Sequence, residues 1–374
     1  MSNGKNYYAD VYAGSMGNFI IITVISCMAL SAVLSQTGVI TKIANWFITR
    51  KSCEGHPYTF LAMFILSFFV IGTFMEATAV TIMYINLASE ICKKLGYKKG
   101  DKFYTVMMCS IYWGNAVVSA GSPISHVLPL LLIAAAAPAL GVTISFGQWL
   151  MVGIPFEIVS YIVIMLIIRF IWKPETEKFS AYDVEAMKQV NPPLSREGKI
   201  TTVIFILVVA AWLFPQFGSS FAPGVTGYLN QIGACVPPIL ALALVCIIHV
   251  DGKPIARFPE LVKTIPMGLL IFTATVTVLG AAVNLDTCGI STWLYNLLSP
   301  ILEGLPTLVI MAILVLGAMI GVLTPAAAVP APLFFGPEHI TVQNTLKYAL
   351  IYLVLTFISI MVIIWPLANI LIKF

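Results

Sequence analysis

Charged residues are scarce in this 374-residue chain, where they make up 10% of the sequence against 59% for hydrophobic residues. A soluble domain carries about 25% charged residues. The balance therefore excludes a water-exposed globule and predicts a multi-spanning membrane protein. The apolar runs are long and do not alternate with period two, which favours transmembrane helices over transmembrane strands.

Several functional signatures are also missing. No CxxC pair occurs among the seven scattered cysteines, which we interpret as small buried apolar residues. The metalloprotease, serine-hydrolase and phosphate-binding patterns HExxH, GxSxG and GxxxxGK[ST] are absent, so the sequence does not predict an enzyme. The net charge of +4 lies in loops without interleaved aromatics, which argues against nucleic-acid binding. The polar N-terminus lacks a signal-peptide pattern, so the first apolar run is expected to remain as a membrane helix.

What the chain does contain is a series of apolar runs, and three of them are too long for one crossing. The runs fall near 17–36, 58–89, 103–142, 147–172, 200–217, 227–250, 264–285, 306–335 and 346–372. A crossing needs about 20 residues, and the three long runs are interrupted at "GTFMEAT", "GNAVVSAGSPIS" and "GVLTPAAAVPAP". Broken helices survive at membrane depth where protein or a water-filled cavity surrounds them.

Lysine and arginine predict the orientation of the loops. They gather in the loops 37–57, 90–102, 173–199 and 251–263 and are missing from 143–146, 218–226 and 286–305. Basic loops are expected on the cytoplasmic side. Both flanks of the run 58–89 are basic, so that run is predicted to enter and leave from the same face as a re-entrant hairpin, with its tip near 72–78.

The polar linker 173–199 divides the chain into two comparable parts, an N-terminal transmembrane repeat at 1–172 and a shorter C-terminal repeat at 200–374. The segment "PYTFLAMFILSFFVIGTFMEATAV" (57–80) matches "PTLVIMAILVLGAMIGVLTPAAAV" (306–329) without a gap. The two parts start on opposite sides of the membrane. We therefore predict an all-α polytopic membrane protein of two inverted repeats, with re-entrant hairpins and broken transmembrane helices, as is typical of secondary transporters.

Three stretches resemble the divalent-anion/sodium symporter (DASS) family of the ion transporter superfamily: "GTFMEATAVTIMYINLA", "SAGSPISHVLPLLL" and "FGPEHITVQNTLKYALIYL". In that family a hairpin tip and the turn of a broken helix occur once per repeat, and together they hold sodium and a carboxylate or sulfate substrate. Here the tip reads Met75-Glu76 before Ala-Thr-Ala, the turn reads "GSPIS", and the second repeat is shorter. The resemblance also implies a homodimer.

Glu76 is the leading functional candidate, because a carboxylate at the centre of a membrane helix costs roughly 2.5–3.5 kcal/mol on insertion scales. It has three candidate roles: ligand of a sodium ion, carrier of a coupling proton, or partner of His126. The alternative is that Glu76 faces an aqueous vestibule and has no specific function. A negative tip opposes anion binding, so we assign Glu76 to the coupling cation rather than to the substrate.

The remaining candidates surround the two tips and the turn. Residues assigned to the coupling ion are Glu76, Thr78, Asn115, Ser119 and Gly121, with sodium expected at Glu76 and Asn115. Residues assigned to the substrate are Ser122, Pro123, Ser125, His126, Thr324 and Pro325. Freed carbonyls and helix N-termini at such a break suit a cation and an anion respectively, whereas the alternative is that Ser and Gly only allow close packing. Glu157 lies deep in the run 147–172 as a second candidate polar partner.

The sequence thus predicts an ion-coupled secondary transporter in the cell membrane, with sodium or a proton as coupling ion and no other cofactor. The substrate class is a small anion, a di- or tricarboxylate, moved by alternating access. Two alternatives remain open: a cation/proton antiporter of the same superfamily, and a non-transporting membrane subunit that pairs with another protein.

Overall fold

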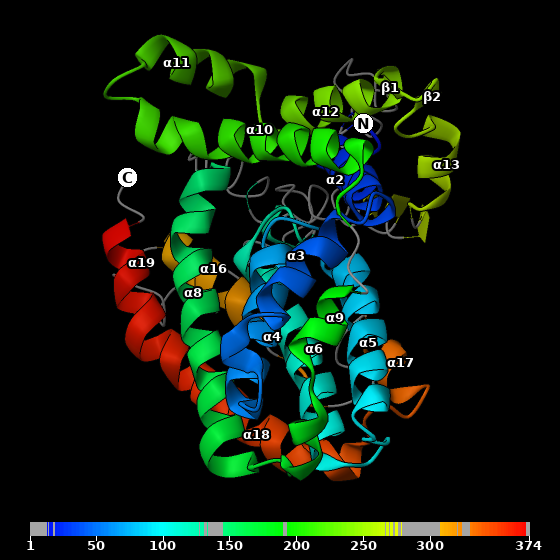
Figure 1. Cartoon of the computed structure of the whole chain (residues 1–374). Helices are drawn as coiled ribbons and strands as arrows, with labels where there is room; N and C mark the ends of the chain where they lie inside the picture. The colour runs from blue at the N-terminus through cyan, green and yellow to red at the C-terminus, as the bar shows by residue number, and fades with distance from the viewer. Residues whose placement is uncertain are drawn as a thin grey trace.

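The computed structural model describes residues 19–126, 128–130, 145–189, 193–265, 307–319, 321–323 and 330–371, with a few single or paired residues outside these ranges. This part of the chain is almost entirely helical (Figure 1). The α-helices are α2 (Phe19–Gln36), α3 (Val39–Ile48), α4 (Pro57–Gly72), α5 (Ala77–Lys94), α6 (Lys102–Gly121), α8 (Phe146–Leu166), α9 (Val184–Gln189), α10 (Arg196–Gly218), α11 (Pro223–Ile232), α12 (Val236–Ile247), α13 (Phe258–Lys263), α16 (Thr307–Met319), α17 (Ala331–Phe335), α18 (Val342–Ser359) and α19 (Trp365–Leu371).

Shorter elements join or extend these helices. Two strands, β1 (His249–Val250) and β2 (Lys253–Pro254), form a small antiparallel hairpin across the turn Asp251-Gly252. Short 3₁₀ turns lie at Lys51–Cys53 and Glu177–Ala181, and π-helical segments extend α8 over Ile167–Trp172 and α18 over Ile360–Ile364. The prediction of an all-α polytopic fold is confirmed.

Three described helices are long and apolar enough to cross a membrane, and up to five spans result if each bent helix pair counts as one. The bent pairs are α2–α3, at 63°, and α11–α12, at 80°. Gly38 and Gly233 lie at these bends with φ of +74° and +76°, which a residue with a Cβ rarely adopts. The apolar run predicted at 227–250 thus contains a break at Gly233 that the sequence analysis did not predict.

The interrupted run 58–89 forms a helical hairpin, as predicted. The hydroxyl of Tyr84 on α5 donates to Ser67 Oγ on α4 at 2.7 Å, and the Tyr84 ring packs edge-on against Phe64 and Phe68. These residues lie at similar distances before and after the turn, so the two helices run side by side in opposite directions. At the last residue of α4, a Cβ on Gly72 would lie 2.9 Å from the Val118 side chain of α6, so glycine lets the hairpin approach α6 closely.

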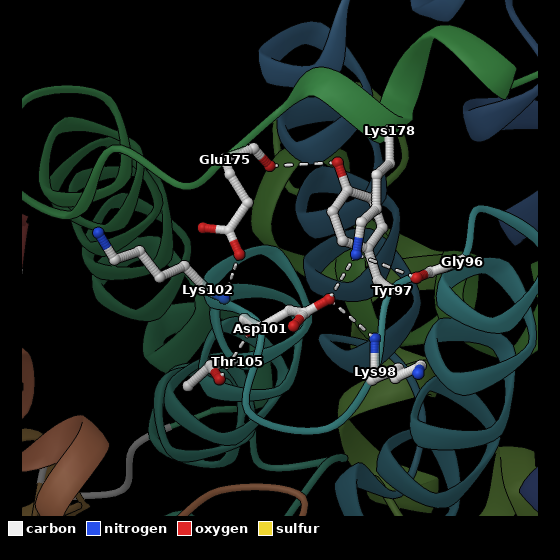
Figure 2. Close-up of polar contacts among 8 residues, drawn as sticks. All are labelled: Gly96, Tyr97, Lys98, Asp101, Lys102, Thr105, Glu175 and Lys178. Carbon is white, nitrogen blue, oxygen red and sulfur yellow. Dashed lines mark hydrogen bonds and ion pairs between the residues drawn. The ribbon is translucent and has the colours of Figure 1, made fainter.

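The open end of the hairpin is fixed to the linker that follows α8 (Figure 2). Lys178 pairs with Asp101 at 3.0 Å and also donates to the Gly96 carbonyl at 3.1 Å. The backbone N–H of Lys102 donates to a carboxylate oxygen of Glu175 at 2.9 Å, and the Tyr97 hydroxyl donates to the Glu175 carbonyl at 3.1 Å. The basic loops 90–102 and 173–199 therefore meet at one end of the helices, in agreement with their predicted common side.

Stacked aromatic rings join the N-terminal helices to α18. Trp172, which ends the extension of α8, stacks on Tyr348 with ring centroids 4.0 Å apart, and Trp113 of α6 stacks on Tyr352 at 4.7 Å. Offset or parallel stacking of this kind adds to the burial of apolar surface. The two predicted repeats therefore share a packed interface; their inverted symmetry stays a prediction, because 324–329 lies outside the described residues.

Helix α10 follows a different course from α8. In Figure 1, α8 runs along the height of the view and α10 runs across its top. Trp212 near the end of α10 stacks on Phe146 at the start of α8, with ring centroids 5.5 Å apart, and its indole donates to the Ala234 carbonyl at 2.8 Å. The helix begins at Arg196, inside the predicted linker 173–199, because the Ser195 side chain caps it by accepting from the Gly198 N–H.

Candidate functional site

A small cavity lies where the hairpin tip meets the turn that follows α6. Its lining includes Glu76 from the tip, Pro123, Ser125 and His126 from the turn, and Cys27 from α2. The volume of about 20 Å³ suits a water molecule or a bare ion and is too small for a tricarboxylate. The structure thus brings four of the predicted site residues to one cavity.

The carboxylate of Glu76 is held by the start of α5. Its two oxygens accept from the backbone N–H groups of Thr78 and Ala79 at 3.0 and 2.7 Å, so the side chain is the N-cap of that helix. The helix dipole favours the negative form of a group at this place. Each oxygen keeps a further lone pair for a ligand. The arrangement therefore suits an ionised carboxylate beside the cavity.

The tip is also tied to its neighbours by main-chain bonds. The N–H of Glu76 donates to Ser31 Oγ of α2 at 3.2 Å, and the N–H of Ala77 donates to the Ser125 carbonyl at 3.1 Å. The Ser125 bond joins the tip directly to the turn after α6. A shift of either segment would therefore change the shape of the cavity.

The turn after α6 is closed by its own side chains. Ser122 Oγ accepts from the Ile124 N–H at 3.1 Å. The Ser125 hydroxyl contacts the Val118 carbonyl, which also accepts the Ser122 N–H, and lies 3.0 Å from the Ser122 carbonyl, which a continuing helix would have used. The His126 ring nitrogen Nδ1 accepts from the Leu128 N–H at 3.3 Å. Glu76 and His126 thus line the same cavity, and each side chain makes its hydrogen bonds within its own segment.

Other predicted site residues lie away from the cavity. Asn115 donates to Thr81 Oγ of α5 at 2.9 Å, and it is buried between these two helices rather than beside Glu76. The Ser119 side chain is buried within α6, and Thr78 contributes its backbone N–H to the carboxylate of Glu76. Thr324 and Pro325 lie outside the described residues. The structure therefore does not place Asn115 beside Glu76, where the two residues were expected to bind one sodium ion.

A second carboxyl group contacts the residue at which the tip begins. Glu157 of α8 is 5% exposed, and its Oε2 is 2.5 Å from the hydroxyl of Thr73, the C-cap residue that follows α4. Its Oε1 has no hydrogen-bond partner within the described part of the chain. Gly121 leaves the space that this carboxyl occupies, since a Cβ there would lie 2.2 Å from Oε1.

The backbones of α6 and α8 are in contact at Gly121 and Gly153, close to this carboxyl. A Cβ on Gly153 would lie 1.8 Å from the Gly121 carbonyl oxygen, and the Trp149 indole donates to the Ala120 carbonyl at 3.0 Å. Gly121, which the sequence assigned to the coupling ion, thus serves as the crossing point of two helices. The hairpin tip, the end of α6 and the middle of α8 meet at one place.

The family model for citrate transporters (CitMHS) matches residues 9–368 of the chain. The chain belongs to the citrate transporter family. The members of this family and the relatives below are transporters rather than enzymes, and the apolar helices of this chain agree with a multi-pass membrane protein. The membership also refines the expected resemblance, since the family matched within the ion transporter superfamily is that of the citrate transporters rather than the DASS family.

Two curated relatives of this citrate transporter family member are also transporters. The sodium-dependent dicarboxylate transporter SdcS of Staphylococcus saprophyticus is 22% identical over 310 residues, which cover 80% of this chain and 58% of that protein. An uncharacterized transporter of Haemophilus influenzae is 22% identical over 186 residues, which cover 49% of this chain and 38% of that protein. The matched parts span less than two thirds of both relatives.

The contact between Thr73 and Glu157 is the feature that sequence analysis missed. Glu157 was noted as a deep carboxylate, but nothing paired it with the hairpin tip. A signal was present in the sequence, because Thr73 lies in the interrupted stretch and Gly153 lies one helical turn before Glu157. Small residues so close to a lone carboxylate indicate a helix crossing at that depth.

Proposed function

We propose that this member of the citrate transporter family is an ion-coupled secondary transporter of a small anion, a di- or tricarboxylate such as citrate, in the cell membrane. The observation that carries the proposal is the meeting of Glu76 with the turn Pro123–His126 around one cavity. A polar tip that faces a broken helix is the arrangement in which transporters bind ions and substrates at mid-membrane depth.

Glu76 holds the coupling cation in this proposal, and sodium is the cation that the site suits best. Its carboxylate is oriented by two backbone N–H groups and lines a cavity of about 20 Å³, which admits a bare cation and excludes citrate. Oxygen ligands are those that hard cations prefer. The dicarboxylate relative is named as sodium-dependent, which supports the same choice.

The substrate is assigned to the turn and to the second tip. Ser122, Pro123, Ser125, His126, Thr324 and Pro325 stay the predicted contacts, and a bound cation at Glu76 would remove the repulsion between that carboxylate and an anion. Assembly as a homodimer is a further part of the proposal; size-exclusion chromatography with light scattering in detergent tests it.

Uptake of labelled citrate and succinate into proteoliposomes, under separate sodium and proton gradients, tests the proposal. We expect uptake of at least one of these anions in the wild type and stimulation by an inward sodium gradient. Glu76→Gln should lose the sodium stimulation while the protein still folds. Glu90→Gln is the matched control, because Glu90 lies on the same helix with an exposed side chain.

The runner-up is a cation/proton antiporter, which the presence of two buried or half-buried carboxyl groups near the tip favours. The same vesicles separate the two functions. Sodium-dependent proton flux without uptake of either anion would replace the symporter by the antiporter. Neither flux nor uptake in a folded protein would favour a non-transporting subunit.

A further inference from the structure

The contact between Thr73 and Glu157 contains more acceptor atoms than the threonine hydroxyl can satisfy. Thr73 Oγ lies 2.7 Å from the Phe69 carbonyl oxygen and 2.5 Å from Glu157 Oε2. A threonine hydroxyl has one hydrogen to donate, and a carbonyl oxygen has none. One hydrogen shared between two acceptors gives two weakened bonds, so both short contacts are full two-centre hydrogen bonds only if Glu157 carries a proton on Oε2 and donates it to Thr73.

The surroundings of Glu157 also favour the neutral carboxylic acid. The side chain is 5% exposed, and Oε1 has no donor among the described residues. An ionised carboxylate buried without a partner is strongly unfavourable, whereas a neutral acid tolerates an unpaired carbonyl oxygen far better. This differs from Glu76, which has two backbone donors.

No described positive side chain offsets a charge at this place. The elements packed on α8 are α4, α6, α10, α18, α19 and the π-helical extensions. Their charged groups, which are Lys102, Arg169, Arg196, Glu197, Lys199 and Lys347, form no ion pair with Glu157. Their other titratable groups are Tyr58, Tyr104, Cys109, Tyr112, Tyr348 and Tyr352, with Tyr161 on α8 itself. Tyr161 lies closest along the helix, and its hydroxyl donates to the Ala62 carbonyl.

We propose that Glu157 is a proton-binding site whose proton holds the hairpin tip against α8 and is released to water when the tip moves away. With the proton present, Glu157 donates to Thr73 and Thr73 donates to Phe69. When the proton leaves, the carboxylate needs the Thr73 hydrogen and water, which the closed contact cannot supply. Proton binding and tip docking are therefore linked, and each favours the other.

The inference rests on the proposed transport function and adds a proton to the cation assigned to Glu76. One proton bound per cycle means that a gradient of one pH unit changes the accumulation of substrate by about tenfold. The two carboxyl groups would then bind two different ions at one tip.

Glu157→Gln tests the inference in proteoliposomes, because the amide imitates the neutral acid in shape and cannot release a proton. We expect folding, sodium stimulation and exchange of internal for external substrate to persist, and the proton-driven part of accumulation to be lost. Glu90→Gln should keep all of these. Accumulation by Glu157→Gln that still changes about tenfold per unit of pH gradient would overturn the proposal.

Two measurements do not depend on transport activity. Infrared spectroscopy of the wild type should show the carbonyl stretch of a protonated carboxylic acid that is missing in Glu157→Gln; identical spectra in that region would overturn the proposal. Hydrogen–deuterium exchange over residues 70–80, corrected for the intrinsic effect of pH, should rise with pH in the wild type and stay constant in Glu157→Gln. Equal pH dependence in both proteins would also overturn it.

Thr73→Val keeps the inference testable if Glu157→Gln does not fold. It retains the acid and removes its acceptor, so the proton is held less tightly and the pH profile of exchange over residues 70–80 should shift to lower pH. Thr73→Ser keeps the hydroxyl and should restore the wild-type profile. An unchanged profile in Thr73→Val would contradict the proposed role. A complete loss of uptake in the wild type would count against the proposed function, while the spectroscopic tests would still decide the state of Glu157.

Discussion

Two carboxyl groups flank the same hairpin tip and have opposite surroundings. Glu76 stands at the start of α5, where two backbone N–H groups point at its oxygens and a cavity lies beside it. Glu157 stands in the middle of α8, where it contacts one threonine hydroxyl and lies against the backbone of Gly121. Backbone dipoles stabilise a charge at the first place, and their absence at the second favours a neutral acid. The same side chain is therefore suited to a metal cation in one place and to a proton in the other.

The largest effect is expected beside Glu157, where the backbones of α6 and α8 are in contact. In Gly153→Ala the new methyl group would lie 1.8 Å from the Gly121 carbonyl oxygen, a backbone atom that cannot rotate away. We expect a loss of about 3 kcal/mol or more in the free energy of unfolding, measured by thermal unfolding in detergent. Gly317→Ala in α16 is the control, because a Cβ there meets no described atom within 4 Å.

A Gly153→Ala protein as stable as the wild type would break the comparison, since the site around Glu157 would then be open rather than closed.

The next effect concerns the single polar partner of Glu157. Thr73→Val replaces the hydroxyl by a methyl group of similar size and leaves the buried carboxyl without its partner. We expect a loss of about 1–3 kcal/mol in the free energy of unfolding, again from thermal unfolding in detergent. Thr73→Ser should stay near the wild type, and equal stability of Val and Ser variants would contradict a hydrogen bond at this site.

A smaller effect is expected at the capped carboxylate. Glu76→Ala removes the acceptor for two backbone N–H groups of α5, and loss of an N-cap costs about 1 kcal/mol. Glu76→Asn should restore most of this stability, because asparagine is also a good N-cap. Stability of Glu76→Ala equal to that of the exposed control Glu90→Ala would show that the cap contributes nothing.

The smallest effect is expected at Asp101, a partly exposed carboxylate that serves as a reference for Glu76 and Glu157. Hydrogen bonding from the Lys98 N–H, and then from Lys178, lowers the pKa of Asp101 below its usual value. The Lys178 and Asp101 side chains are 48% and 29% exposed, so solvent screens the pair and Asp101→Asn should cost about 0.5 kcal/mol.

The pH dependence of Asp101 follows from the direction of this shift. A lowered native pKa means that the contribution is complete above the unfolded value of about 4 and is lost as the pH falls through the native pKa. Unfolding of the wild type and Asp101→Asn should therefore differ near neutral pH and converge in acid. A difference that grew in acid would contradict this assignment.

Composition and loop charge were sufficient to predict the helical membrane fold, the hairpin 58–89 and the break after Gly121, because these features depend on local patterns. A meeting of the tip with the turn was implied by the family resemblance, and pairing of Glu76 with His126 was one of three candidate roles. The contact of Thr73 with Glu157 was not, because 84 positions separate the two residues along the chain and only packing brings them together. Asn115 shows the reverse: its polarity suggested a ligand, yet its amide is satisfied by Thr81 on the neighbouring helix.

The glycine contact between α6 and α8 has a mechanical consequence. Side chains that interdigitate between helices can exchange rotamers and let the helices slide, but at Gly153 the backbone of α8 lies directly against the backbone of Gly121. The indole bond from Trp149 to Ala120 adds a second fixed point one turn away. Helices α6 and α8 are therefore expected to move as a single strut during any change of access. Relative motion must then occur between this pair of helices and its neighbours. The hairpin contacts the pair at Thr73, so we expect the contact of Thr73 with Glu157 to change early in that motion.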